Sequence, residues 1–450
     1  MLPSVALALG LIFYLWLIRQ DMTLRGKISV GLWIPFLWLL IKSSRPVTAW
    51  LGIGGGNQID GNPIEAAIAF VLFFGAFVVL QRRRFPWTTM ATLNGTFFLL
   101  IVYFGISALW SPYPFVTFKR WFKEFGNILI ALVVLTEASP PAALKALCVR
   151  CAYLLFPLSI VLIKYFPAWG RAYTVGGFPM ITGVTQQKNS LGLICCVFGL
   201  ALVWDIIDTW ERQAPGGRRW RSVLPQLLTI AIGLWLLALS QSKTSLLAFA
   251  AGAAILFSTR LGPIARAPRA FAATCMIVIP VLLLIAALKT LTIAPLLEAV
   301  GRDATFTERT NIWNAVLAQD INPIIGCGFY SFWLEHAAAV AALGVPQIEA
   351  HNGYLETYLD GGIIGCILLG LFLFATCSRL ARSFSPTSTW SRALFAFAIM
   401  GLITNFAETY FFRLDTIWFV FVVSALALPI LQQVDESQEL AARSAWVSSG

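Results

Sequence analysis

The residues best suited to proton transfer are the only two histidines of the chain, His336 and His351, and both lie in one polar stretch, residues 301–365. A neutral imidazole titrates at about pH 6.5, so it can accept a proton under ordinary conditions. His351 precedes an apolar run that would fix it just above a bilayer, and it is the candidate general base. The alternative is an imidazole packed beside Tyr354 and Tyr358 on an apolar face. His336 is interpreted as structural.

Four cations are candidates for binding an anion. Arg302 and Arg309 open the polar stretch, Lys243 stands between two apolar segments with almost no loop, and Lys188 stands where GVTQQKNSLG enters another. A charge with so little polar surrounding is costly unless it has a partner or faces water. Cations converging on one membrane face would suit an anionic headgroup, above all a diphosphate. Ordinary snorkelling at helix ends is the alternative, particularly for Lys188.

The carboxylates do not suggest a metal-dependent nucleotide-sugar enzyme. No Asp-x-Asp pattern occurs, so a carboxylate site for Mg²⁺ or Mn²⁺ is not supported, and no metal or cofactor is expected. Glu356 lies five positions after His351, about 140° around a helix, which makes it a poor partner within that helix. Glu408 could reach the site from another segment, but surface pairing with Arg413 is the favoured interpretation.

The composition indicates an integral membrane protein. Of 450 residues, 58% are hydrophobic and 12% charged, and the mean hydropathy is +0.79, whereas soluble domains are about 25% charged. The net charge of +11 does not suggest nucleic acid, because short basic runs fit the cytoplasmic ends of spans. The eight cysteines lie mostly in apolar runs and are interpreted as structural.

The apolar segments predict an all-α polytopic protein with 12 or 13 transmembrane helices. A spanning helix needs about 20 mostly apolar residues, and several segments approach this length only with their polar ends. The segments are 3–18, 28–41, 63–80, 90–109, 124–137, 153–168, 190–208, 223–239, 244–258, 271–287, 362–377, 393–410 and 414–431.

These spans divide the chain into four parts. They are an N-terminal bundle of about ten spans (1–287), a large loop with short helices (288–361), C-terminal spans (362–431) and a cytoplasmic tail expected to be disordered (432–450). Basic residues fall in alternating loops, which the positive-inside rule assigns to the cytoplasm. The large loop then faces outward. Three residues of one other outward loop do not fit this pattern: Lys119, Arg120 and Lys123.

Inside the large loop, two helices are expected. Thr305 or Thr307 would cap the first, which begins near Glu308. Pro346 would begin the second, which ends at Gly361–Gly362. On the second helix four residues would share one face: His351, Tyr354, Leu355 and Tyr358.

Several of these motifs resemble one superfamily. ISALWSP (106–112), GVTQQKNSLG (183–192), GRDATFTERTNIW and HNGYLETYLDGGIIG occur in the order found in the O-antigen ligase and polysaccharide polymerase superfamily, and they look most like ExoQ-type polymerases. The resemblance implies a GT-C-like, metal-independent membrane glycosyltransferase that uses an undecaprenyl-diphosphate-linked glycan donor. It implies His351 as the base, and Arg309 and Lys243 as diphosphate ligands. Lys243 stands where the ligases usually have Arg, which favours a polymerase.

The functional hypothesis is therefore polymerisation of undecaprenyl diphosphate-linked repeat units into exopolysaccharide or O-antigen. It would proceed by inverting transfer at the periplasmic face of the bacterial inner membrane. Asn352, Tyr354 and Glu356 are expected to support the site, and a flippase and a chain-length co-polymerase are expected partners. One alternative is a ligase that transfers glycan to lipid A core. The other is a permease, which would keep its polar residues at mid-membrane on broken helices.

Overall fold

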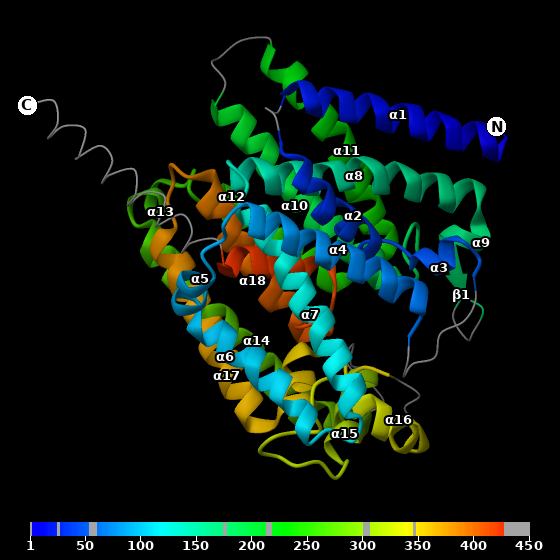
Figure 1. Ribbon diagram of the computed structural model, residues 1–450, viewed down its shortest axis with the longest axis vertical. Helices are drawn as coiled ribbons and strands as arrows, with labels where there is room; N and C mark the ends of the chain where they lie inside the picture. The colour runs from blue at the N-terminus through cyan, green and yellow to red at the C-terminus, as the bar shows by residue number, and fades with distance from the viewer. Residues whose placement is uncertain are drawn as a thin grey trace, which may run out of the picture.

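The computed structural model is a bundle of helices with one pair of short strands (Figure 1). It describes residues 2–24, 28–53, 61–173, 177, 179–212, 218–299, 307–344 and 348–426, with the backbone alone at 24, 218–219, 287–299 and 307–308. The predicted all-α class is confirmed. The predicted tail, 432–450, and Arg302 lie outside the described residues.

The elements follow one another along the chain in this order: α1 (Pro3–Leu24), η1 (Val30–Leu32), α2 (Trp33–Lys42), α3 (Val47–Trp50), α4 (Pro63–Arg82), α5 (Trp87–Leu93), α6 (Gly95–Ile106), η2 (Ser107–Leu109), α7 (Pro114–Leu135), α8 (Pro140–Tyr165), α9 (Pro167–Gly170), β1 (Arg171–Tyr173), β2 (Pro179–Ile181), α10 (Lys188–Arg212), α11 (Arg218–Ser240), α12 (Lys243–Ser258), α13 (Gly262–Arg266), α14 (Pro268–Ala299), α15 (Thr307–Leu317), α16 (Phe332–Ala342), α17 (Gly353–Ser383) and α18 (Thr389–Ala407). A further helix covers Thr416–Leu426. The strands β1 and β2 pair antiparallel.

Eight helices of the described residues are long and apolar enough to cross a membrane, or nine if the pair α5 and Gly95–Leu109, bent by 97°, counts as one span. This is fewer than the twelve or thirteen predicted. Three predicted spans coincide with shorter apolar helices: Val30–Lys42, Lys243–Ser258 and Thr416–Leu426. A fourth, 124–137, falls on α7, which is long enough but carries several charges in its first half. The multi-pass character is confirmed.

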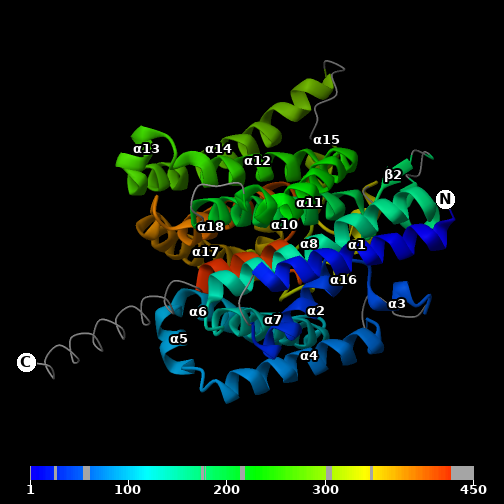
Figure 2. The ribbon, with the colours of Figure 1, turned by 90° about the horizontal axis from the view of Figure 1, so that it is seen from above.

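The hydrophobic core lies around α10 and α18. Their most apolar windows are 89% and 94% buried inside the protein, whereas that of α14 is 6% buried and leaves its apolar side chains outward. Figure 2 shows α14 and α4 at opposite outer layers, with α10 and α18 between them. A helix that is apolar all round belongs in such a centre.

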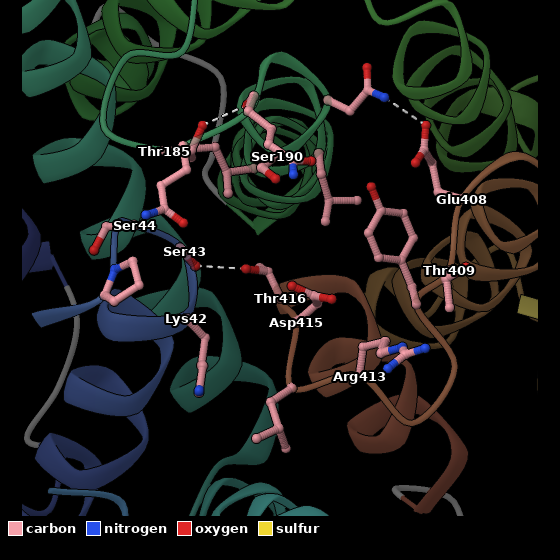
Figure 3. A pocket seen from close by; sticks show the side chains of 18 of the residues that line it. Lys42, Ser43, Ser44, Thr185, Ser190, Glu408, Thr409, Arg413, Asp415 and Thr416 are labelled. Carbon is pink, nitrogen blue, oxygen red and sulfur yellow. Dashed lines mark hydrogen bonds between the residues drawn. The ribbon is translucent and has the colours of Figure 1, made fainter. Parts of the chain in front are cut away.

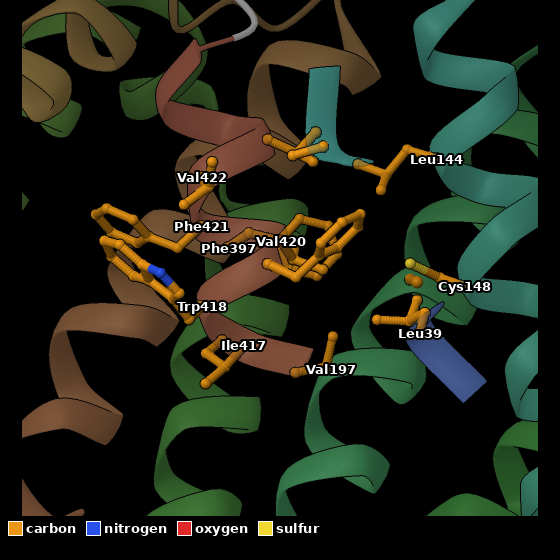
Figure 4. Packing of buried hydrophobic residues seen from close by; sticks show 14 of the residues in the cluster. Leu39, Leu144, Cys148, Val197, Phe397, Ile417, Trp418, Val420, Phe421 and Val422 are labelled. Carbon is orange, nitrogen blue, oxygen red and sulfur yellow. The ribbon is translucent and has the colours of Figure 1, made fainter. Parts of the chain in front are cut away.

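The last helix fills the centre of the bundle. Trp418 and Phe421 stack with their rings 5.6 Å apart, and Figure 4 shows them on the same helix as Val420, which points toward neighbouring side chains of the core. Around this helix lie side chains from four others: Leu39 of α2, Leu144 and Cys148 of α8, Val197 of α10 and Phe397 of α18.

One end of the bundle gathers loops that the charge pattern assigned to the cytoplasm. Asp208 pairs with Lys145 and, at 2.9 Å, with Arg212. Arg392 pairs with Glu211 at 2.7 Å. Three predicted cytoplasmic loops are thereby joined by ion pairs.

The three cations that did not fit the charge pattern lie on the first half of α7. Arg120 donates a hydrogen bond of 2.6 Å to the carbonyl of Tyr330, a residue of the large loop. In Figure 1, α7 runs from the centre of the bundle to the region of α15 and α16. Arg120 therefore lies on the side of the large loop. The first half of α7 is charged and faces this loop, whereas the second half is apolar.

The large loop differs from the prediction in two places. The helix α14 continues to Ala299, beyond the predicted boundary at 287, and α15 begins at Thr307 as expected. The second predicted helix does not run through His351, because residues 348–352 are not helical and α17 begins at Gly353. The expected break at its end is present, since Gly362 has φ 59° and ψ −159°.

Candidate functional site

A single buried carboxylate, that of Glu408, joins three segments that are far apart in the sequence. One oxygen accepts hydrogen bonds from Arg309 Nη2 at 2.9 Å and from Asn189 Nδ2 at 2.8 Å. The other lies 3.1 Å from His351 Nδ1. The backbone carbonyl of Glu408 accepts from Gly353 N at 3.0 Å. Glu408 follows the last turn of α18 in an extended conformation, which turns its side chain toward the large loop.

The expectation that Glu408 pairs with Arg413 at the surface is wrong. Glu408 is only 7% exposed, and Arg413 lies 3.3 Å from Glu356 instead. The chain turns between the two residues, with Phe412 at a positive φ of 58°. This reversal sends the two side chains to different partners, which spacing in the sequence could not reveal.

His351 owes its position to an unusual backbone rather than to a helix. Its φ is +48°, in the left-handed region that histidine enters more readily than bulky residues do, at some cost in strain. The prediction that it shares a helical face with Tyr354 and Tyr358 is therefore wrong. Asn352 follows as the N-cap of α17, and its side chain accepts from the amides of Tyr354 at 3.0 Å and Leu355 at 3.1 Å.

The predicted supporting residues have structural contacts in the fold. Asn352 caps α17, and the hydroxyl of Tyr354 donates to the carbonyl of Leu402 at 3.1 Å. Glu356 accepts from Trp333 Nε1 at 2.8 Å and from the amide of Ala350 at 2.7 Å. Glu356 forms no hydrogen bond with His351 among the described residues, but it holds Ala350, the residue before His351.

Electrostatics favour the protonated form of His351. Burial lowers the pKa of the imidazole, but the hydrogen bond to Glu408 and the charges of Glu349 and Glu408 outweigh it, so the pKa is raised above 6.5. Glu349 Oε1 lies 3.3 Å from Nδ1. Burial also raises the pKa of Glu349, more than its cationic neighbours lower it. Among the described residues no hydrogen bond occupies Nε2, and the side chain is 21% exposed.

A cavity of about 450 Å³ opens beside this group. Figure 3 shows Glu408 and Arg413 on one side of it, Lys42 and Ser43 on another, and Ser190 on the entering turn of α10. Four carboxylates and two cations line it: Glu65, Glu349, Glu408 and Asp415, with Lys42 and Arg413. The lining is thus acidic and rich in hydroxyls and amides, which are suitable groups for binding sugar hydroxyls.

The structure brings some of the predicted cations together. Arg309 contacts Glu408. Lys188 is the first residue of α10, next to Asn189, which also contacts Glu408. Lys243 is the first residue of α12 and is exposed, with no ion pair to any described residue.

The start of α12 lies close to the start of α10. A side chain at Gly192 would come within 2.6 Å of Ser242 Cβ, so only glycine permits this approach. Ser242 precedes Lys243, and Gly192 lies about one helical turn after Lys188. The two lysines are therefore at the same end of the bundle. No direct contact joins Lys243 to Arg309 among the described residues.

Glu349, His351 and Glu408 also form a group whose possible ligand atoms lie within 4.8 Å of one another. The guanidinium of Arg309 is bound to Glu408 at 2.9 Å. A fixed positive charge at this distance repels a divalent cation. The arrangement is better suited to holding a histidine and an arginine in place.

Sequence reasoning missed Asn189 and the role of Glu408. The role of Glu408 could have been inferred from its place in TNFAETYFF, where it is an acidic residue between two strongly apolar segments. An isolated carboxylate there needs a buried partner. Asn189 gave no such signal, because an asparagine at the start of a helix is common as a cap.

A family model matches the part of the chain that carries three of the predicted site residues, while Asn189 and Glu408 lie outside its range. This family model is described as O-antigen ligase and matches residues 228–370, a range that includes Lys243, Arg309 and His351. The chain is a multi-pass membrane protein, and this part of it is similar to the O-antigen ligase family. It is also similar to the exopolysaccharide production protein ExoQ of Rhizobium meliloti (strain 1021), with 24% identity over 331 residues, 69% of this chain and 71% of that protein. The resemblance predicted from the motifs is confirmed.

Proposed function

We propose that this protein polymerises undecaprenyl diphosphate-linked oligosaccharide units by inverting glycosyl transfer at the periplasmic face of the inner membrane. The observation that carries the proposal is the group His351–Glu408–Arg309, in which one buried carboxylate holds a base and a cation together. The similarity to a protein of exopolysaccharide production supports a polymer as the product. A flippase and a chain-length co-polymerase remain proposed partners.

In this mechanism His351 acts through Nε2. Glu408, close to Nδ1, favours the tautomer with a proton on Nδ1 and a lone pair on Nε2. Nε2 removes the proton of the acceptor hydroxyl as its oxygen attacks the anomeric carbon. The bond from that carbon to the diphosphate oxygen breaks, and the diphosphate leaves with the electron pair. Glu408 also stabilises the imidazolium that forms.

The departing diphosphate is assigned to the cations at this end of the bundle. Arg309 has five N–H donors and uses one nitrogen on Glu408, so others remain for phosphate oxygens. Lys188 and Lys243 begin α10 and α12, and the positive end of a helix adds to the stabilisation of an anion there. Loss of one such preorganised donor typically costs about 2.7–4 kcal/mol in the transition state.

A ligase remains the second candidate, because the matching family model is itself described as O-antigen ligase. It would use the same donor and the same base with lipid A core as acceptor. A permease has less support: the contacts of Glu408 lie at the ends of helices α10 and α18 and in the large loop, rather than at mid-membrane.

The decisive experiment supplies the purified protein in liposomes with one lipid-linked repeat unit as the sole substrate. A polymerase gives a ladder of products that grows by one unit, and NMR of the new linkage shows inverted anomeric configuration. Addition of lipid A core should leave the ladder unchanged. A product that forms only when lipid A core is present would reject polymerisation in favour of ligation.

A further inference from the structure

A second cavity, which the mechanism above does not use, lies against the first. Its volume is about 320 Å³, and it shares three lining residues with the acidic cavity: Tyr330, Arg413 and Leu414. The remaining lining comes from α7, α16 and the loop beside them: Arg120, Lys123, Trp333, Leu334, Ile348 and Phe412. The two cavities are thus neighbours separated by a wall that belongs to both.

The charge of this second cavity is opposite to that of the first. Three cations line it and no carboxylate does. Glu356, which pairs with Arg413 at 3.3 Å, is absent from the lining. Glu356 therefore holds Arg413 from outside the cavity. The remaining N–H donors of the guanidinium are left for an anion such as a phosphate.

Tyr330 organises two of the three cations. The guanidinium of Arg413 lies 3.8 Å from the centre of its ring, and that of Arg120 lies 5.7 Å from it. Arg120 also donates to the carbonyl of Tyr330. The residue takes a positive φ of 60°, a conformation that costs energy for a tyrosine. The guanidinium groups of Arg413 and Arg120 are therefore both held near the ring of Tyr330, a residue with a strained backbone.

Lys123 adds a third charge, which Glu65 stabilises only at a distance and without an ion pair. Among the described residues no ion pair within 4.0 Å involves it. Lys119 and Arg120 lie near enough for their charges to repel it. These three residues are also the ones that break the alternation of basic loops. The positive-inside rule leaves the outward face of the membrane poor in Lys and Arg. A cluster of positive charges there is unfavourable unless an anion binds among them.

We propose that the second cavity binds an anionic group of a second substrate molecule, and so holds the acceptor beside the His351 site. The anion is either the diphosphate of the acceptor lipid or an acidic group on its glycan. This inference rests on the proposed polymerase function, which requires two lipid-linked molecules at once. Tyr330, Trp333 and Phe412 give the cavity aromatic faces against which a sugar ring or a lipid chain can pack.

The test titrates the full-length protein in phosphatidylcholine nanodiscs with farnesyl diphosphate, followed by isothermal calorimetry. The wild type should bind two equivalents, and Lys123→Gln should lose one or weaken it about tenfold or more. Lys123→Arg should retain both. The matched control is Lys119→Gln, which removes an equal charge four residues away outside the lining and should change the isotherm less than about twofold.

A parallel titration uses a lipid-free trisaccharide that contains glucuronic acid. If Lys123→Gln weakens only this ligand, the anion is on the glycan, which still supports the second cavity as the acceptor site. If the variant binds both probes as the wild type does, the inference is overturned. The proposed function is judged separately, because normal polymer from His351→Ala would reject the base while leaving these binding results intact.

Discussion

At the scale of single residues, the two carboxylate oxygens of Glu408 have different partners. One holds Arg309 and Asn189, and the other lies beside His351. His351, Arg309, Lys243 and Lys188 were predicted as site residues from residue type and motif, because a cation or an imidazole in apolar surroundings is costly without a function or a partner. The shared partner of His351 and Arg309 was not predicted, since Glu408 lies 57 positions after His351 in the chain. Only the fold brings that carboxylate to the imidazole.

The raised pKa of His351 gives a prediction about pH. The base must be neutral, so activity should fall as the pH falls through this pKa. Glu408→Gln removes the carboxylate that raises the pKa, so the acid limb of the pH profile should move to lower pH. The maximal rate should also fall by about tenfold or more, since the imidazolium loses its partner. The measurement is kcat/KM against pH in both proteins.

The control is Glu335→Gln, which changes a carboxylate beside His336 instead of His351. It should leave the profile in place. An acid limb that stays at the same pH in Glu408→Gln would show that the rate does not report the His351–Glu408 pair.

At the scale of elements, the kink of α17 links the large loop to the membrane helices. The amides of Ile363 and Ile364 donate to the carbonyls of Pro323 and Ile324, so the loop lies along the kink. The glycine pair predicted the break. The non-helical approach to His351 was not predictable, because Pro346 and the helical spacing of the tyrosines both favoured an earlier start. A hydrogen bond between Gly353 and Glu408 outweighs that local preference.

Gly362→Ala should therefore destabilise the protein by several kcal/mol, about 3 or more. Its φ of 59° and ψ of −159° are open essentially to glycine alone. An added Cβ would also lie 2.4 Å from the backbone of Ile324. The measurement is thermal unfolding in detergent, followed by tryptophan fluorescence.

Gly370→Ala, in the same helix, is the matched control. Nothing lies within 4 Å of the Cβ it would add, and alanine favours a helix over glycine by about 1 kcal/mol. Its melting temperature should be equal or higher. Equal melting temperatures for the two variants would show that the kink does not hold the loop.

At the scale of the whole molecule, the chain is a bundle with two chemically different ends. The class and the approximate positions of the spans were predictable from hydropathy, because every predicted apolar segment overlaps a helix of the described residues. The number of spans was not predictable, since several apolar helices are shorter than a membrane-spanning helix needs to be and the pair α5–α6 is bent by 97°. The two neighbouring cavities of opposite charge were also not predictable, because their linings come from segments distant in sequence.

The assignment of the ends to membrane faces predicts a labelling pattern. Ile324→Cys, in the large loop and 57% exposed, should react with a membrane-impermeant maleimide in intact cells whose outer membrane is permeable to it. Ser385→Cys, between α17 and α18, should react only after the inner membrane is opened. The wild type supplies the background from its eight free cysteines. Reversed labelling would place the site on the cytoplasmic face.

The most direct test of the central claim is single-turnover glycosyl transfer by purified His351→Ala. A general base contributes about 10²–10⁴-fold, so the transfer rate should fall by at least about a hundredfold while farnesyl diphosphate still binds with the wild-type affinity. Lys164→Ala, an exposed lysine on α8, should retain the wild-type rate. Transfer by His351→Ala at the wild-type rate would contradict the assignment of His351 as the base.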